Sequence, residues 1–182
     1  FAEGAPAGDR EDSDRIEQRV LGKLTWQLNQ SHKLLFLIDW DDVVHDYRGV
    51  GDDVLASGAQ RQESPNYVYN LSWEGVLGDA SFVSAKLTGY TGGDDRLPYY
   101  GDTPNRFDRE SGFDWATYYR TSIKDVERVA LDAAWSLFVD GLLAANDSHD
   151  FKFGIDYEEF ETDWVTQRTG GSFGWAGRAH GL

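Results

Sequence analysis

The chain has neither of the two sulfur-containing residue types, because its 182 residues include no Cys and no Met. Without Cys, a disulfide framework and a thiolate metal site are both excluded. The chain also lacks a run of about 18 apolar residues, which excludes a transmembrane helix. No charged-then-apolar stretch at the start marks a signal peptide. The missing Met is expected of a chain that has lost its initiator. Soluble domains and membrane β-barrels remain.

Basic charge is scarce: 17 Lys and Arg stand against 32 Asp and Glu, for a net charge of −15 and a pI near 4.5. A nucleic-acid partner is therefore not expected, since such proteins carry a basic face. Aromatic residues make up 14% of the chain. The mean hydropathy of −0.55 is compatible with membrane β-strands, whose apolar face is hidden in an alternating pattern.

Apolar and polar residues alternate with period two in six segments, as in antiparallel strands. The cleanest segment is 151–158, where Phe, Phe, Ile and Tyr alternate with Lys, Gly, Asp and Glu. We expect about six long strands that form three hairpins, at approximately 16–46, 66–91 and 123–161. Residues 126–143 leave a helix open as an alternative, because this stretch is rich in Ala.

The expected connections alternate between short and long. Each hairpin closes with a turn of a few residues, whereas 47–64 and 91–121 are predicted as long loops, and so are the ends 1–13 and 162–182. Membrane barrels have this asymmetry, with short periplasmic turns and long extracellular loops. The expected strands of about 10 to 14 residues exceed the usual 5–6 and suffice to cross a bilayer. Aromatic residues lie towards the expected strand ends: Trp40, Tyr67, Tyr69, Tyr90, Trp135 and Tyr157.

Two segments carry a family resemblance. Residues 23–29 (Lys-Leu-Thr-Trp-Gln-Leu-Asn) and 149–158 (His-Asp-Phe-Lys-Phe-Gly-Ile-Asp-Tyr-Glu) resemble barrel strands of TonB-dependent receptors of the bacterial outer membrane. The similarity is to the subgroup with a carboxypeptidase-regulatory-like N-terminal domain, and it covers approximately 16–163. A TonB box, a plug domain and a terminal strand ending in an aromatic residue are not found.

The resemblance implies an up-and-down transmembrane barrel segment in the outer membrane. It further implies uptake of a scarce ligand, such as a metal chelate, a peptide or a glycan, powered by the TonB complex. The implied partners are outer-membrane lipid, the remaining barrel strands and the plug domain. Residues 1–182 are then one part of a larger barrel domain, because six strands are too few to close one and such transporters have about 22.

Two sets of residues are candidates for ligand contact. Aromatic and Arg side chains in the longest loop resemble adhesive, ligand-reading surfaces; they are Tyr99, Tyr100, Arg106, Arg109, Trp115, Tyr118 and Tyr119. Polar residues on the inner face of the expected strands form the second set, which would face the lumen. They are Lys23, Thr25, Gln27, Asn70, Ser72, Glu74, Lys86, Arg128, Asp132, Lys152 and Asp156.

Catalytic and metal-site motifs are weak. The acidic runs 39–42 and 92–95 leave a loop-bound calcium ion open, although neither matches an EF-hand loop. The four His lack the spacing of a zinc enzyme, and no nucleophile elbow or phosphate loop occurs. We therefore expect no catalytic residues, no enzyme activity and no other cofactor. A soluble all-β ligand- or carbohydrate-binding module and a β-rich hydrolase are the alternatives.

Overall fold

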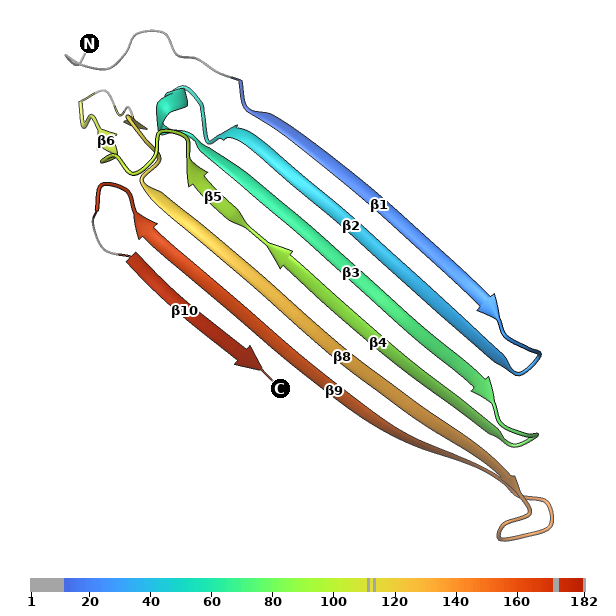
Figure 1. Cartoon of the computed structure of the whole chain (residues 1–182). Coiled ribbons are helices and arrows are strands. Elements are labelled where there is room, and N and C mark those ends of the chain that lie inside the picture. Colours follow the sequence, from blue (N-terminus) through green and yellow to red (C-terminus); the bar gives the residue numbers. More distant parts are fainter. Residues whose placement is uncertain (1–11, 111, 113, 172–173, 182) are drawn as a thin grey trace.

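A computed structural model of the chain describes residues 12–110, 112, 114–171 and 174–181. The fold is all-β and is dominated by one antiparallel, up-and-down sheet (Figure 1). Seven strands follow one another across it in the order β1-β2-β3-β4-β8-β9-β10, and β5 lies between β3 and β8. The strands are β1 (Asp14–Gln27), β2 (His32–Arg48), β3 (Gln60–Val76), β4 (Ser81–Gly93), β5 (Asp95–Pro98), β8 (Arg120–Asp140), β9 (Ser148–Arg168) and β10 (Gly174–Gly181).

The cross-strand register places residues of similar polarity beside one another on neighbouring strands. One row runs across six strands and is apolar throughout: Leu24, Phe36, Leu71, Leu87, Leu131 and Tyr157. Because side chains alternate between faces along a strand, the next row lies on the opposite face. We call the face that carries the row from Leu24 to Tyr157 the apolar face, and the opposite face the polar face. The strand interpretation of 126–143 is confirmed for residues 126–140, which belong to β8 and all pair with β9, whereas 141–143 lie in the connection to β9.

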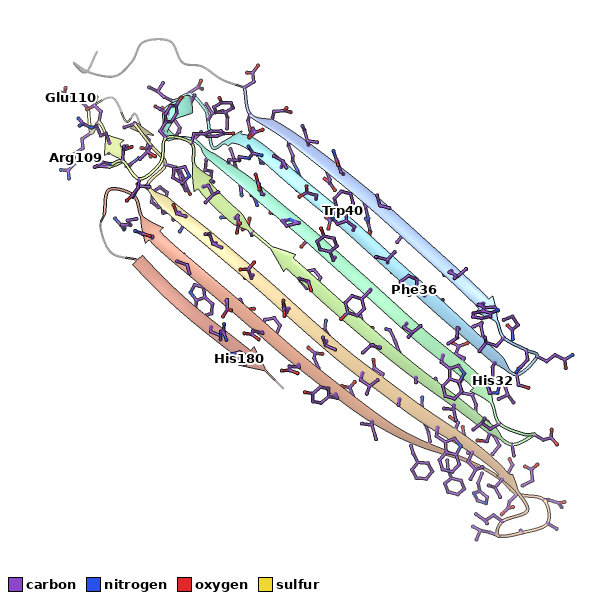
Figure 2. The ribbon with its side chains drawn as sticks, viewed as in Figure 1. His32, Phe36, Trp40, Arg109, Glu110 and His180 are labelled. Carbon is purple, nitrogen blue, oxygen red and sulfur yellow. The ribbon has the colours of Figure 1, made fainter. Side chains whose placement is uncertain are left out.

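The sheet is a single layer, and side chains stand on both sides of it (Figure 2). Phe36 and Trp40 follow one another along the apolar face of β2. Among the described residues, the buried apolar side chains are Ala56 and Ala59 at the loop end. Large apolar side chains on the sheet stay uncovered, and Ile155 is 72% exposed. The chain therefore forms a sheet wall without a hydrophobic core beneath it.

The strands are longer than expected. β8 and β9 each have 21 residues, and the hairpin they form extends past both predicted ends. The prediction of a long loop over 162–182 was wrong, because β9 continues to Arg168 and β10 occupies Gly174–Gly181. Cross-strand hydrogen bonds continue the strands at these ends, although the alternation of apolar and polar residues that guided the prediction becomes weak there. Pro65 lies within β3, at the point where pairing changes from β4 to β5, and Pro is tolerated at such irregularities.

The two ends of the sheet have connections of different length, as expected (Figure 1), but β3 begins at Gln60 within the predicted 47–64 loop, and β5 lies within the predicted 91–121 loop. Short turns join β1 to β2, β3 to β4 and β8 to β9 at one end of the sheet. At the other end lie the 3-10 helix η1 (Ala56–Gly58) and the small two-stranded sheet of β6 (Arg106–Phe107) and β7 (Asp114–Trp115). We call these the turn end and the loop end.

Candidate ligand-facing surface

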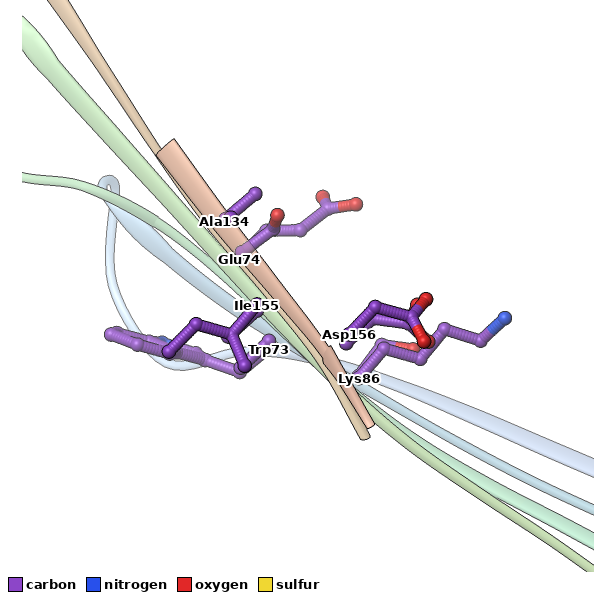
Figure 3. Close-up of a pocket in the computed structure, with 12 residues that line it drawn as sticks. Trp73, Glu74, Lys86, Ala134, Ile155 and Asp156 are labelled. Carbon is purple, nitrogen blue, oxygen red and sulfur yellow. The ribbon is translucent and has the colours of Figure 1, made fainter. Parts of the chain in front are cut away.

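The polar face gathers the residues predicted to face a lumen. The register places all eleven on this one face: Lys23, Thr25, Gln27, Asn70, Ser72, Glu74, Lys86, Arg128, Asp132, Lys152 and Asp156. Figure 3 views the sheet nearly along its plane, with Glu74, Lys86 and Asp156 on one side and Trp73 and Ile155 on the other. The predicted division of the strands into two faces is therefore present in the fold.

Ion pairs between neighbouring strands balance much of the charge on the polar face, from the turn end to the middle of the sheet. Lys33 Nζ lies 2.6 Å from Glu74 Oε2, and Arg128 Nη2 donates to Glu158 Oε2 at 2.7 Å. These side chains are about half exposed, so each pair contributes at most about 1 kcal/mol. The pairs make a hydrated, nearly neutral wall.

The polar face is basic at the loop end of β5, β8 and β9. Arg120 of β8 is paired directly with Arg168 of β9, and Lys124 lies four residues further along β8. Arg96 of β5 is paired with Ser122, so it joins the same surface. Like charges placed opposite one another on a sheet are destabilising. A surface of this kind is suited to an anion.

One carboxylate, Asp94, is part of this basic surface. Burial acts to raise its pKa, but hydrogen bonds from Arg96, Gln62 and Ser64 outweigh burial and hold the pKa below its usual value. Asp94 is therefore ionised at neutral pH and occupied by protein donors. It neutralises Arg96 and leaves Arg120, Lys124 and Arg168 as the positive charge of the surface.

The loops at the loop end are joined into one cluster. Asn105 Nδ2 donates to the carbonyl of Thr117 at 2.8 Å, and the Thr117 hydroxyl donates to the carbonyl of Gly101 at 3.2 Å. Thr117 has no exposed surface. The backbone N–H of Ala116 donates to Ser57 Oγ in η1. These bonds fix the 99–119 segment against the β2–β3 connection.

The predicted aromatic and Arg set is dispersed over this cluster. Tyr99 stacks on Tyr47 with ring centroids 4.5 Å apart, and its hydroxyl donates to Asp46 Oδ1 at 2.5 Å. Burial, and next the hydrogen bond to Asp46, raise the pKa of Tyr99 to about 12. Tyr99 is therefore held by the protein and serves the loop structure.

The other members of the set lie in different surroundings. Tyr118 and Tyr119 are in ring contact, with centroids 4.6 Å apart, and the Arg120 guanidinium lies 5.1 Å from the centre of the Tyr119 ring. Tyr100, Arg106 and Arg109 are exposed. The side chain of Trp115 lies outside the described part of the chain. The structure thus connects Tyr118 and Tyr119 to the basic surface and does not join the seven residues into one site.

The acidic runs do not form loop clusters. Residues 39–42 lie within β2, where alternation sends Asp41 to the polar face and Asp42 to the apolar face. Asp39 is bound by Arg19, whose Nε donates to it at 3.0 Å. No group of three or more metal-ligating side chains is found in the described ranges. A loop-bound calcium ion stays a prediction.

Residues that the sequence analysis passed over complete the basic surface. Lys124, Thr162 and Trp164 lie on the polar face of β8 and β9, next to Arg120 and Arg168. Lys124 lies at the start of the predicted 123–161 hairpin, and Thr162 and Trp164 lie in the predicted 162–182 loop. The signal available in the sequence was the continued alternation of Phe160, Thr162, Trp164 and Thr166 with acidic or apolar residues.

Comparisons of the chain with protein-family models, with curated proteins and with solved structures found no match. In the described residues, none of the helical structure has the length and apolar character that a bilayer-spanning helix needs.

Proposed function

We propose that this chain is a wall segment of an outer-membrane β-barrel, with the apolar face in lipid and the polar face towards a water-filled lumen. The apolar face supports this by its dimensions. On β8 the apolar positions run from Val129 to Val139, which is about 34 Å along the strand. At the usual strand tilt this length gives about 26 Å across a bilayer, close to the apolar band of about 25 Å in membrane barrels.

The observation that carries the proposal is the slant of this apolar band across the sheet. On β1 the band begins at Val20, whose row passes through Trp40 and Tyr67 and reaches Glu161 on β9. On β9 the band begins at Tyr157, four residues further towards the turn end. A shift of about 14 Å over five strand spacings of about 4.8 Å corresponds to roughly 30°. Strands in membrane barrels tilt by about 35–45°, so a membrane-parallel band must cross them obliquely.

Aromatic side chains lie towards both ends of the band. Towards the loop end lie Trp40 and Tyr67, and towards the turn end lie Trp73, Trp135 and Phe153. The Trp135 and Phe153 rings are 5.7 Å apart. Aromatic belts of this kind mark the two interfaces of a bilayer. The loop end would then be extracellular and the turn end periplasmic.

A soluble all-β binding module is supported less well. Such a domain buries its apolar sheet face under a second layer. Here Leu24, Trp26 and Ile155 are 62%, 59% and 72% exposed. Contact with lipid accounts for this surface without a covering layer.

The receptor role rests on the resemblance of 23–29 and 149–158 to strands of TonB-dependent receptors. In this role the segment contributes to uptake of a scarce ligand, with the plug domain, the remaining strands and the TonB complex as partners. Further strands would also satisfy the free backbone groups of β1 and β9, because open sheet edges do not occur in lipid.

These 182 residues contain no Cys, so a Cys introduced among them provides a specific label once any Cys elsewhere in the native-length protein has been replaced. Single Cys residues placed at each position from 126 to 137 in the native-length protein would be labelled in isolated outer membranes with a water-soluble maleimide. We expect strong labelling at polar-face positions such as Ala130 and Asp132, and weak labelling at Leu131 and Ala133. The same variants in urea should label uniformly. Uniform labelling in membranes, or recovery of the protein in the soluble fraction, would overturn the proposal.

A further inference from the structure

A hollow lies on the polar face of β8, β9 and β10, at the loop end. Its volume is about 510 Å³, within the range of small-ligand sites. The lining side chains include Ser122, Lys124, Phe160, Thr162, Trp164 and Thr166. On β9 these positions lie beyond Tyr157 in the direction of the loops, so the hollow is outside the apolar band.

Trp164 forms a flat wall of this hollow. Its indole ring lies across Gly177 of β10, where an added Cβ would be 2.2 Å from ring atom Cζ2. Only glycine leaves room for the ring in this position. The side chain remains 39% exposed. An indole held in this way offers an apolar platform on which a ring can stack.

Thr162 indicates that the occupant is polar. It is 7% exposed, and its hydroxyl Oγ1 has no hydrogen-bond partner among the described residues. A buried polar atom without a partner costs free energy, which a bound hydroxyl or oxygen would recover. Ser122 and Thr166, whose hydroxyls are 3.5 Å apart, add two more groups that donate and accept.

The charge around the hollow indicates that the occupant is anionic. Lys124 is in the lining, and Arg120 and Arg168 face one another at its loop-side border. The Nε atom of Arg120 is buried and has no hydrogen-bond partner among the described residues. This concentration of cations occurs in a chain with a net charge of −15.

We propose that this hollow binds a sugar ring that carries a carboxylate, phosphate or sulfate group. Trp164 stacks on the ring, the hydroxyls of Ser122, Thr162 and Thr166 meet the sugar hydroxyls, and Lys124 with Arg168 binds the anionic group. The inference rests on the proposed receptor function and deepens it by naming a ligand class.

Calorimetric titration of the intact protein in detergent micelles tests the proposal with glucuronate, glucose and inorganic phosphate as probes. Charge-assisted hydrogen bonds are about twice as strong as neutral ones, so glucuronate should bind at least about tenfold more tightly than glucose. Because phosphate lacks a ring for Trp164, it should bind about tenfold more weakly than glucuronate. Equal affinity for glucose, equal affinity for phosphate, or no binding of glucuronate would overturn the proposal.

Variants localise the binding. Lys124→Gln and Arg168→Gln should each weaken glucuronate binding about fivefold to tenfold, by loss of a charged donor. Arg178→Gln is the matched control, because Arg178 lies on the opposite face of β10, bound to Asp163. It should change the affinity less than about twofold. An equal loss in the control would contradict the assigned site.

Folding and the barrel proposal are checked separately. Each variant is first compared with the parent by its maleimide labelling pattern in membranes. A protein that keeps period-two labelling but does not bind glucuronate would overturn the sugar site and leave the barrel proposal standing. A protein that binds glucuronate but labels uniformly would overturn the barrel proposal instead.

Discussion

At the loop end of β8 and β9, the two faces of the sheet carry opposite charge. On the apolar face, beyond the apolar band, lie Asp125, Glu127, Glu159, Glu161 and Asp163, with Arg178 of β10 beside them. On the polar face of the same strands lie Arg120, Lys124 and Arg168. The net charge of −15 therefore averages over two surfaces with different preferences for a partner. The charge of each face, and not the net charge of the chain, therefore indicates which partner that face can bind.

The middle of the sheet differs in another way. There the apolar face has neither charge nor cover, whereas the polar face carries paired charges such as Arg128 with Glu158. Adjacent residues of one strand thus lie on faces that tolerate different substitutions. The same substitution at two neighbouring positions can therefore distinguish the apolar face from the polar face.

Ala133→Arg should have the largest effect. Ala133 is near the centre of the apolar band on β8, where an Arg in contact with lipid costs about 2–4 kcal/mol. Its neighbour Ala134 lies on the polar face, so Ala134→Arg should cost less than about 1 kcal/mol. Unfolding from lipid vesicles in urea measures both. Equal costs at the two positions would remove the distinction between the faces.

Gly89→Ala should have an intermediate effect. An added Cβ would lie 1.9 Å from Cζ of Tyr69, so the ring on the apolar face must move. Overpacking of this kind costs about 1–3 kcal/mol. Gly154→Ala on the polar face is the control, since the added Cβ would have its nearest contact at 3.3 Å, with the Ala133 carbonyl oxygen. We expect the urea midpoint to fall clearly for Gly89→Ala and slightly for Gly154→Ala; the reverse order would contradict the packing of Tyr69.

Alkaline titration of Tyr99 should have the smallest effect, and it extends the comparison to the loop cluster. The pKa of Tyr99 is raised to about 12, so the fold favours the neutral phenol. Its contribution to stability is complete below pH 10 and is lost as the pH rises through about 12. The absorbance difference between the parent protein and Tyr99→Phe reports this titration. Asp46→Asn should lower the pKa of Tyr99 partway, because burial is the larger cause; an unchanged pKa would exclude the Asp46 contribution.

The strands in which apolar and polar residues alternate clearly could be predicted from the sequence. Residues 151–158 alternate without a fault, and the structure places Phe151, Phe153, Ile155 and Tyr157 on one face. The hairpin pairs were predictable because short turns force neighbouring strands to pair. The predicted polar face followed from the same alternation.

The loop-end parts of the strands were not predictable by this method. Beyond Tyr157, β9 carries acids on the apolar face and hydroxyl or aromatic side chains on the polar face, so the hydrophobic pattern disappears while the hydrogen bonding continues. The hollow depends on strands from β8 to β10, including a β10 that was predicted as loop. A site built from three strands depends on their register, which alternation in each strand does not specify.

The sequence by itself determined the antiparallel strands, the separation of each strand into an apolar and a polar side, and the short connections within the three hairpins. Local alternation and turn chemistry are sufficient for these features. The tertiary structure decided which rows align across strands, and with them the slanted apolar band, the facing Arg120 and Arg168, and the contact of Trp164 with Gly177. Register arises from hydrogen bonds between residues that are distant in the chain. The alignment of the strands is therefore decided only when they pair in the folded protein.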